Sequence, residues 1–355
     1  MNISTSCLAD AGLPTRRRFK VLPWYAVLPC GLAAALLVAV SMGNYATAPA
    51  EIVTFLLQML GLGQLDNAHY AALYNILVEI RLPRILAAML VGSSLAVSGA
   101  AFQAVFRNPL VSPGLLGVQS GAAFGAALAI LCGWHWSAVQ GLSFAMGLSA
   151  VGVSVLIANA FGHSSLVMLV LGGIISCALF SSLVTVIKYV ADPLNVLPSI
   201  VYWLMGNLGA ATLDKVLLFS GPLLFGVLFL SCCGRFLDAL SMGDDEARSL
   251  GVPVGVVRYA VIAVTTMISA LTVSLAGNIG WIGLLIPHVV RLTLGPANTR
   301  VLPASALAGA LFLVVADGCA RCVTVLDIPI GIVTELLGIP AFLLVVNRAR
   351  KGWVG

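Results

Sequence analysis

A few ionisable side chains of this 355-residue chain lie within long apolar stretches, where a charge is costly and usually functional. Asp317 and Arg321 are four residues apart, so on a helix they would share a face and could form an ion pair. Glu335 lies in the run 332–337, which has no basic residue within one helical turn. Glu335 therefore either lines a polar pathway or faces other helices as a neutral, hydrogen-bonded acid.

A second charged motif is Arg81-Leu82-Pro83-Arg84, which directly precedes an apolar stretch. Guanidinium groups pair strongly with carboxylates, so these two arginines could bind an acidic partner. They could equally anchor the chain to lipid headgroups, and the residues alone leave both interpretations open.

Several common kinds of catalytic chemistry are absent from the sequence. No lysine is followed by serine or threonine, so the chain lacks the phosphate-binding loop of ATPases. The four histidines, at positions 69, 135, 163 and 288, have no neighbouring residues at metal-ligand spacing. We therefore expect neither an enzyme nor a metal site, and any ATP that powers this protein must be bound by a partner.

The composition is that of a helical membrane protein. Only 9% of residues are charged and 60% are hydrophobic, whereas soluble domains have about 25% charged residues. A soluble enzyme, a nucleic-acid binder and a disordered chain are thereby excluded. Apolar runs of helical length predict ten membrane spans. The predicted spans are 23–43, 84–105, 114–132, 138–160, 166–188, 213–233, 258–276, 280–294, 302–323 and 330–346.

The distribution of basic residues predicts the orientation of these spans. Ten spans place both termini on one side of the membrane, and 13 of the 18 Lys and Arg residues fall on that side. Cytoplasmic loops carry such an excess, so both termini are expected in the cytoplasm, with the bacterial inner membrane as the location. We divide the chain into a cytoplasmic segment 1–22, a membrane domain 23–346 in contact with lipid, and a cytoplasmic tail 347–355.

Short helices are predicted outside the spans. Segments 50–60, 68–80 and 198–208 are expected to form external helices on the far side. In the cytoplasmic loop 241–257, acidic residues favour a helix start and Gly251 favours its end; that helix comprises Asp244, Asp245, Glu246, Ala247, Arg248, Ser249 and Leu250. Pro253 could begin a second short helix. Such a loop is either a docking element for a soluble partner or a solvated connector.

Small residues recur at four-residue spacing in the third predicted span. Gly117, Gly121 and Gly125 would lie on one helix face, where they allow a neighbouring helix backbone to approach closely. The spacing predicts tight helix packing, and it is common in membrane proteins of many functions.

Several longer motifs carry a resemblance to a known family. They are Arg81–Arg84, Gly92 with Ser98-Gly99, the run 106–117 (Phe-Arg-Asn-Pro-Leu-Val-Ser-Pro-Gly-Leu-Leu-Gly), residues 242–251, the run 276–288 and the run 328–334. In this order, over about residues 75 to 350, they resemble the FecCD-type permease subunits of type II ABC importers, which take up iron chelates, haem and vitamin B12.

The resemblance implies an all-α permease fold of about ten transmembrane helices. It also implies partners: a second copy of the chain, two ATP-binding cassette subunits that hold ATP and magnesium, and a periplasmic binding protein. No cofactor would be bound by this chain. Arg81, Arg84 and Arg321 match family arginines that dock the binding protein. Residues 243–254 match the loop that the ATPase subunits contact and displace. Asn108 and Leu110 match one cytoplasmic gate of the translocation channel. The family's second gate falls at 162–167, where this sequence does not match.

The expected function is ATP-driven import by alternating access. A ferric siderophore is the expected cargo because it is the commonest in the family, with haem and cobalamin as alternatives. A proton-coupled transporter using Glu335 is a distant rival class, in which the 243–254 loop would be dispensable. A membrane-embedded enzyme would need catalytic groups that we do not find in the sequence.

Overall fold

The computed structural model describes residues 24–43, 45, 47–63, 65–160, 166–323 and 327–351, and this described part is all-helical. The predicted segment 1–22 lies outside the described residues, as does most of the possible second gate. The elements are α1 (Trp24–Ser41), α2 (Pro49–Met59), α3 (Asn67–Tyr74), η1 (Asn75–Arg81), α4 (Leu82–Val105), η2 (Pro113–Leu116), α5 (Val118–Leu131), α6 (Trp136–Ala160), α7 (Leu166–Val190), α8 (Val196–Leu204), α9 (Leu213–Cys232), α10 (Gly234–Met242), α11 (Asp244–Ser249), α12 (Val254–Ala276), α13 (Ile282–Leu294), α14 (Asn298–Cys322) and α15 (Ile330–Lys351).

The predicted spans correspond to the observed helices. Within the described ranges, seven helical segments are long and apolar enough to cross a membrane: α1, the continuous segment Asn67–Val105, α6, α7, α9, α12 and α14. Helices α5, α13 and α15 are shorter apolar helices and occupy the third, eighth and tenth predicted spans. The polytopic all-α fold class is confirmed.

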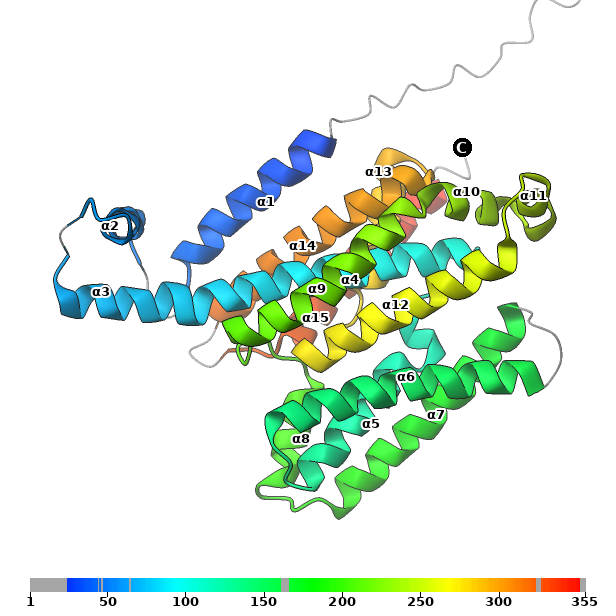
Figure 1. The fold of residues 1–355 in the computed structure, drawn as a ribbon, viewed down its shortest axis with the longest axis horizontal. Helices are drawn as coiled ribbons and strands as arrows, with labels where there is room; N and C mark the ends of the chain where they lie inside the picture. The colour runs from blue at the N-terminus through cyan, green and yellow to red at the C-terminus, as the bar shows by residue number, and fades with distance from the viewer. Residues whose placement is uncertain are drawn as a thin grey trace, which may run out of the picture.

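Helix α4 lies at the centre of the larger of two helix groups (Figure 1). It contacts α9, α12, α13 and α14, and nearly all of its residues are buried. Helices α5 to α8 form the second group, which α12 joins to the first through its contacts with α5 and α6. Helix α1 lies on the outside against α14, with most of its surface uncovered.

Glycines permit the closest contacts between these helices. A Cβ atom on Gly99 of α4 would stand 1.8 Å from the carbonyl oxygen of Gly283 of α13. On α5, a Cβ on Gly121 or Gly125 would stand 2.3 Å from a backbone oxygen of α6, so the predicted tight packing of these two residues is confirmed. Gly117 acts differently: its φ of 89° makes the turn between η2 and α5.

The predicted external helix 68–80 is wrong as a separate element. Residues Asn67–Val105 form one continuous 39-residue helix, in which the seven residues Asn75–Arg81 are π-helical. In a regular α-helix the ring of Pro83 would collide with the carbonyl four residues earlier, and proline has no N–H to donate. A local departure from α geometry is a common adjustment in such a helix.

The loop 241–257 also differs in part from the prediction. The short helix α11 forms, and Gly251 follows it with a φ of 78°. The second short helix is wrong, because the segment after Pro253 is already the first turn of the long helix α12. Helix α10 was not predicted. It buries Leu237 and Leu240, which are three residues apart and therefore lie on one helix face.

Candidate functional site

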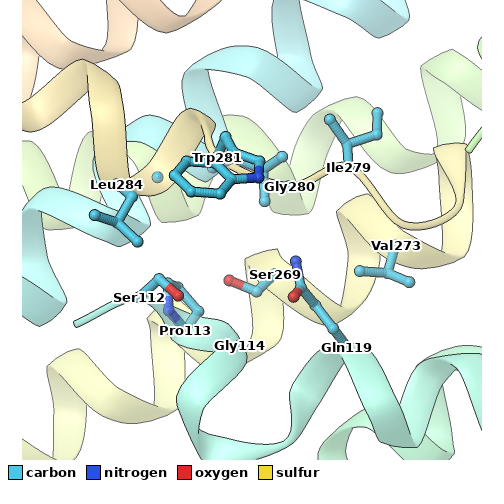
Figure 2. A pocket seen from close by; sticks show the side chains of 12 residues that line it. Ser112, Pro113, Gly114, Gln119, Ser269, Val273, Ile279, Gly280, Trp281 and Leu284 are labelled. Carbon is cyan, nitrogen blue, oxygen red and sulfur yellow. The ribbon is translucent and has the colours of Figure 1, made fainter. Parts of the chain in front are cut away.

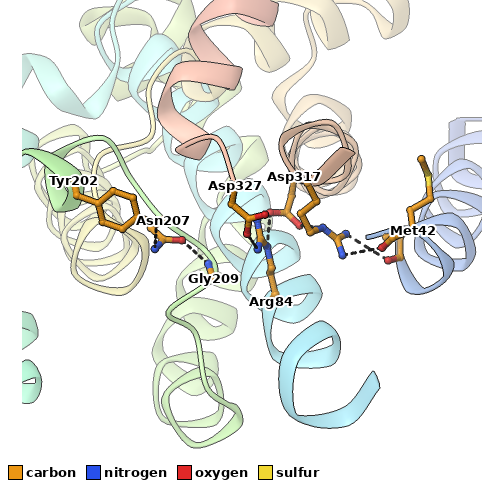
Figure 3. Close-up of polar contacts among 9 residues, drawn as sticks. Met42, Arg84, Tyr202, Asn207, Gly209, Asp317 and Asp327 are labelled. Atoms are coloured by element: carbon orange, nitrogen blue, oxygen red, sulfur yellow. Dashed lines mark hydrogen bonds and ion pairs between the residues drawn. The ribbon is translucent and has the colours of Figure 1, made fainter. Parts of the chain in front are cut away.

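One end of the bundle carries a cluster of buried arginines. Arg84 of α4 lies between two carboxylates: its Nε is 2.8 Å from Oδ1 of Asp317 on α14, and its Nη1 pairs with Asp327, before α15 (Figure 3). Arg321 Nε lies 3.1 Å from the other oxygen of Asp317, which confirms the predicted i,i+4 pair. Asp317 is thus shared by two guanidinium groups.

The arginines also hold the C-terminal end of α1. Arg81 donates to the carbonyls of Val40 and Tyr45 and to the Thr47 hydroxyl, 2.6 Å away. Arg321 donates to the carbonyls of Met42, at 3.2 Å, and Ala39, at 3.4 Å. The last carbonyls of a helix have no hydrogen-bond donors within the helix. Here the guanidinium groups of Arg81 and Arg321 donate to them.

If these three arginines dock a binding protein, as the resemblance implies, they should be accessible from outside. In the structure of the single chain they are instead buried. Arg81, Arg84 and Arg321 are 4%, 7% and 6% exposed, and Asp317 is 1% exposed. They nevertheless line one cavity of about 210 Å³, together with Gly43, Tyr45, Ile76, Ile80 and Asp327. We call this cavity and the charged residues around it the arginine cavity. It contains three arginines and two aspartates, so it has a net positive charge. Asp327 gave no local sequence signal, because Arg84 lies 243 positions away.

The opposite end of the bundle carries α11 (Figure 1). Because α1 ends and α15 begins at the arginine cavity, the other ends of these two helices are directed towards the α11 end. Ala247 is fully buried and anchors α11, whereas Asp245, Glu246, Arg248, Ser249 and Leu250 are exposed. An anchored helix that presents charges and an exposed leucine is suited to docking a soluble partner.

Asp244 fixes the start of α11. Both of its carboxylate oxygens accept hydrogen bonds from Arg258 Nη2, at 2.7 and 2.8 Å, and Oδ1 also lies 3.3 Å from Arg107 Nη2. The hydrogen bond from Arg258 and the positive charges of Arg258, Arg107 and Arg248 lower the pKa of Asp244 despite its partial burial. Its carboxylate is therefore ionised at neutral pH.

The predicted gate residues occupy a tight turn at this same end. Asn108 Oδ1 accepts a hydrogen bond from the Leu110 N–H at 2.9 Å, an Asx-type turn. The Leu110 side chain is 58% exposed. The turn thus leaves an apolar side chain at the surface, and the gate role of these two residues stays a prediction.

Glu335 lies on α15 with its side chain exposed, close to Gly280, where a Cβ atom would stand 3.9 Å from Glu335 Oε1. Gly280 also lines a cavity of about 60 Å³ between the two helix groups. Figure 2 shows Ser112, Gln119, Ser269 and Trp281 around this cavity. The Ser269 hydroxyl is buried and has no hydrogen-bond partner among the described residues. Glu335 thus lies near one residue, Gly280, of a small cavity that is also lined by three polar residues.

A solved structure defines the class of protein. The chain matches, with a TM-score of 0.81 and 35% identity, a structure described as an inward-facing metal-chelate type ABC transporter. The match covers 91% of this chain and 98% of the other. With its many apolar helices, this protein has the fold of a permease subunit of a type II ABC importer.

The sequence comparisons identify the family. The FecCD transport family matches residues 31–348, and the chain belongs to that family. It is 39% identical to the molybdate import permease MolB of Haemophilus influenzae (78% of this chain, 82% of MolB). It is 37% identical to the hemin permease HmuU of Yersinia pestis (79% and 85%) and 40% identical to the vitamin B12 permease BtuC of Escherichia coli (77% and 84%).

Proposed function

We propose that this chain is the membrane subunit of an ATP-driven importer of a metal chelate, with a ferric siderophore as cargo. The chain-long match to a metal-chelate type transporter carries this proposal. Haem and cobalamin are the alternatives within it, and the molybdate permease among the relatives adds an oxyanion to the cargoes that must be tested.

The proposed assembly has two copies of this chain, two ATPase subunits that bind ATP and magnesium, and a periplasmic binding protein. It lies in a bacterial inner membrane with both termini in the cytoplasm. The binding protein docks at the arginine cavity, and the ATPases contact the exposed face of α11. ATP-driven closure of the ATPases displaces α11, and the bundle alternates between outward- and inward-facing arrangements.

Uptake into proteoliposomes tests this function. The chain is reconstituted with its ATPase and binding protein, and a ferric siderophore, haem, cobalamin and molybdate are offered in parallel, with ATP or with a proton gradient. We expect ATP-dependent uptake of the ferric siderophore. Uptake driven by the gradient without ATP would instead support a proton-coupled transporter.

The docking role of Arg81 predicts a loss of binding-protein affinity. Arg81→Gln removes a charge from the arginine cavity, and a charge-assisted hydrogen bond contributes about 1.5–3 kcal/mol, or about tenfold or more in affinity. Added salt should weaken the wild-type contact. Binding of the purified binding protein to the permease in nanodiscs measures both effects.

Thr47→Ala is the matched control for this experiment. It deletes the hydroxyl that accepts from Arg81 while it keeps the guanidinium charge. We expect near-normal docking for Thr47→Ala. Equal losses in the two variants would assign Arg81 to the internal support of α1 and remove it from the docking surface.

The pathway role of Glu335 predicts an effect on transport without an effect on assembly. Glu335→Gln keeps the size of the side chain and removes its charge, so uptake of the cargo should change severalfold while the complex elutes normally from a gel-filtration column. Unaltered uptake of every cargo offered would show that the carboxylate takes no part in the pathway.

A further inference from the structure

The gate turn begins with an arginine where glycine is usual. Helix α4 ends at Val105 with Phe106 as its C-cap, and the next residue, Arg107, has a φ of 51°. The Arg107 N–H donates to the Ala104 carbonyl and the Asn108 N–H to the Gln103 carbonyl, which is the Schellman pattern. Its left-handed position is costly for any residue with a side chain. The turn thus carries a long, charged side chain at a position that glycine usually occupies.

That side chain reaches the start of α11. Arg107 Nη2 lies 3.3 Å from Asp244 Oδ1, and Arg258 of α12 holds the same carboxylate. One carboxylate thus joins three segments: the end of α4, α11 and the start of α12. It also separates two positive charges that would otherwise repel each other.

The gate residues follow within the same turn. The Leu110 N–H donates to Asn108 Oδ1, and the Val111 N–H donates to the Asn108 carbonyl. These bonds, together with the Schellman bonds, tie residues 106–111 into one unit that we call the gate turn. A force on the Arg107 side chain therefore acts on Asn108 and Leu110 together.

We propose that Arg107 is a positioning residue that transmits the displacement of α11 to the gate turn through its ion pair with Asp244. This inference rests on the proposed function, since it presumes that an ATPase moves α11. Arg107 and Asp244 are 40% and 29% exposed, and such pairs contribute little to folding stability. Their loss should thus impair coupling and leave the fold intact.

The decisive variant is Arg107→Gly, which suits the left-handed position and removes only the side chain. In proteoliposomes of the complete transporter, we expect the cargo imported per ATP hydrolysed to fall at least about fivefold, the lower end of the usual coupling between sites. Arg107→Lys, which retains the charge, should preserve most of that ratio. Arg300→Gln is the control, because it neutralises an exposed arginine at the same end of the bundle.

A double variant shows whether the two residues act through their ion pair or each disturb transport independently. Asp244→Asn should lower the ratio, and adding Arg107→Gly should lower it no further, since the pair is already broken. A wild-type ratio in Arg107→Gly, or effects that simply add, would overturn the inference. A wild-type complex that imports nothing with ATP would overturn the proposed function instead, so the two failures are distinguishable.

Discussion

Gly99→Val is expected to abolish folding of the chain. The Cβ atom alone would stand 1.8 Å from the Gly283 oxygen and 2.6 Å from its Cα, inside any allowed contact. Both obstacles are backbone atoms of α13, so no side chain can rotate away. Helix α4 would have to separate from α13, and α4 is the helix on which most of the larger group packs. Membrane helices associate largely through such close contacts, so the loss is general and not local.

Gel filtration in detergent measures this effect. We expect the Gly99→Val protein to give no monodisperse peak, and Gly99→Ala to be severely impaired because the clash begins at Cβ. Gly152→Val is the matched control: Gly152 lies on α6 with no atom within 4 Å of its would-be Cβ, so its peak should be unchanged. A normal peak for Gly99→Val would mean that α4 and α13 do not contact each other as described.

Asp317→Asn is expected to lower stability by about 3–5 kcal/mol, the usual cost of leaving a buried charge without its partner. Asp317 is the carboxylate common to Arg84 and Arg321. Without its charge, the half-exposed Asp327 is the remaining counter-ion that contacts Arg84, and Arg321 keeps hydrogen bonds to carbonyls alone. Chemical denaturation in detergent micelles, followed by tryptophan fluorescence, measures the loss.

Two comparisons test the explanation. Asp327→Asn should cost less, because 33% of that side chain is exposed and water can take over its role for Arg84. Adding Arg321→Met to Asp317→Asn should recover part of the loss, because it deletes the cation left unpaired. If the double variant is less stable than Asp317→Asn alone, the unpaired charge of Arg321 is not the cause of the loss.

Interactions between near neighbours in sequence could be predicted, and those between distant segments could not. Apolar runs located the spans, and four-residue spacing predicted both the Asp317–Arg321 pair and the packing of Gly121 and Gly125. Arg84 is different, because its partners lie more than 230 positions away and no local pattern indicates them. The resemblance supplied Arg81, Arg84 and Arg321 as a group, but not their burial.

Two local features of the backbone could not be predicted from the sequence. A separate helix 68–80 was expected before the span 84–105, yet one helix runs from Asn67 to Val105 through the π-helical segment Asn75–Arg81. Arg107 gave no sign of a helix-ending turn, since glycine is the usual signal there. Both features are set by the folded backbone, and no residue spacing in the sequence indicates them.

The attachment of α1 has a consequence for how the protein is made. Among the described helices α1 is translated before the others, yet the groups that complete its C-terminal end come much later. Arg81 follows the Val40 carbonyl by 41 residues, and Arg321 follows the Met42 carbonyl by 279. Until α14 is synthesised, part of that helix end must rely on water or headgroups at the bilayer surface. The C-terminal end of α1 therefore obtains its last hydrogen-bond donors only after 279 further residues have been translated, and until then it has to remain hydrated.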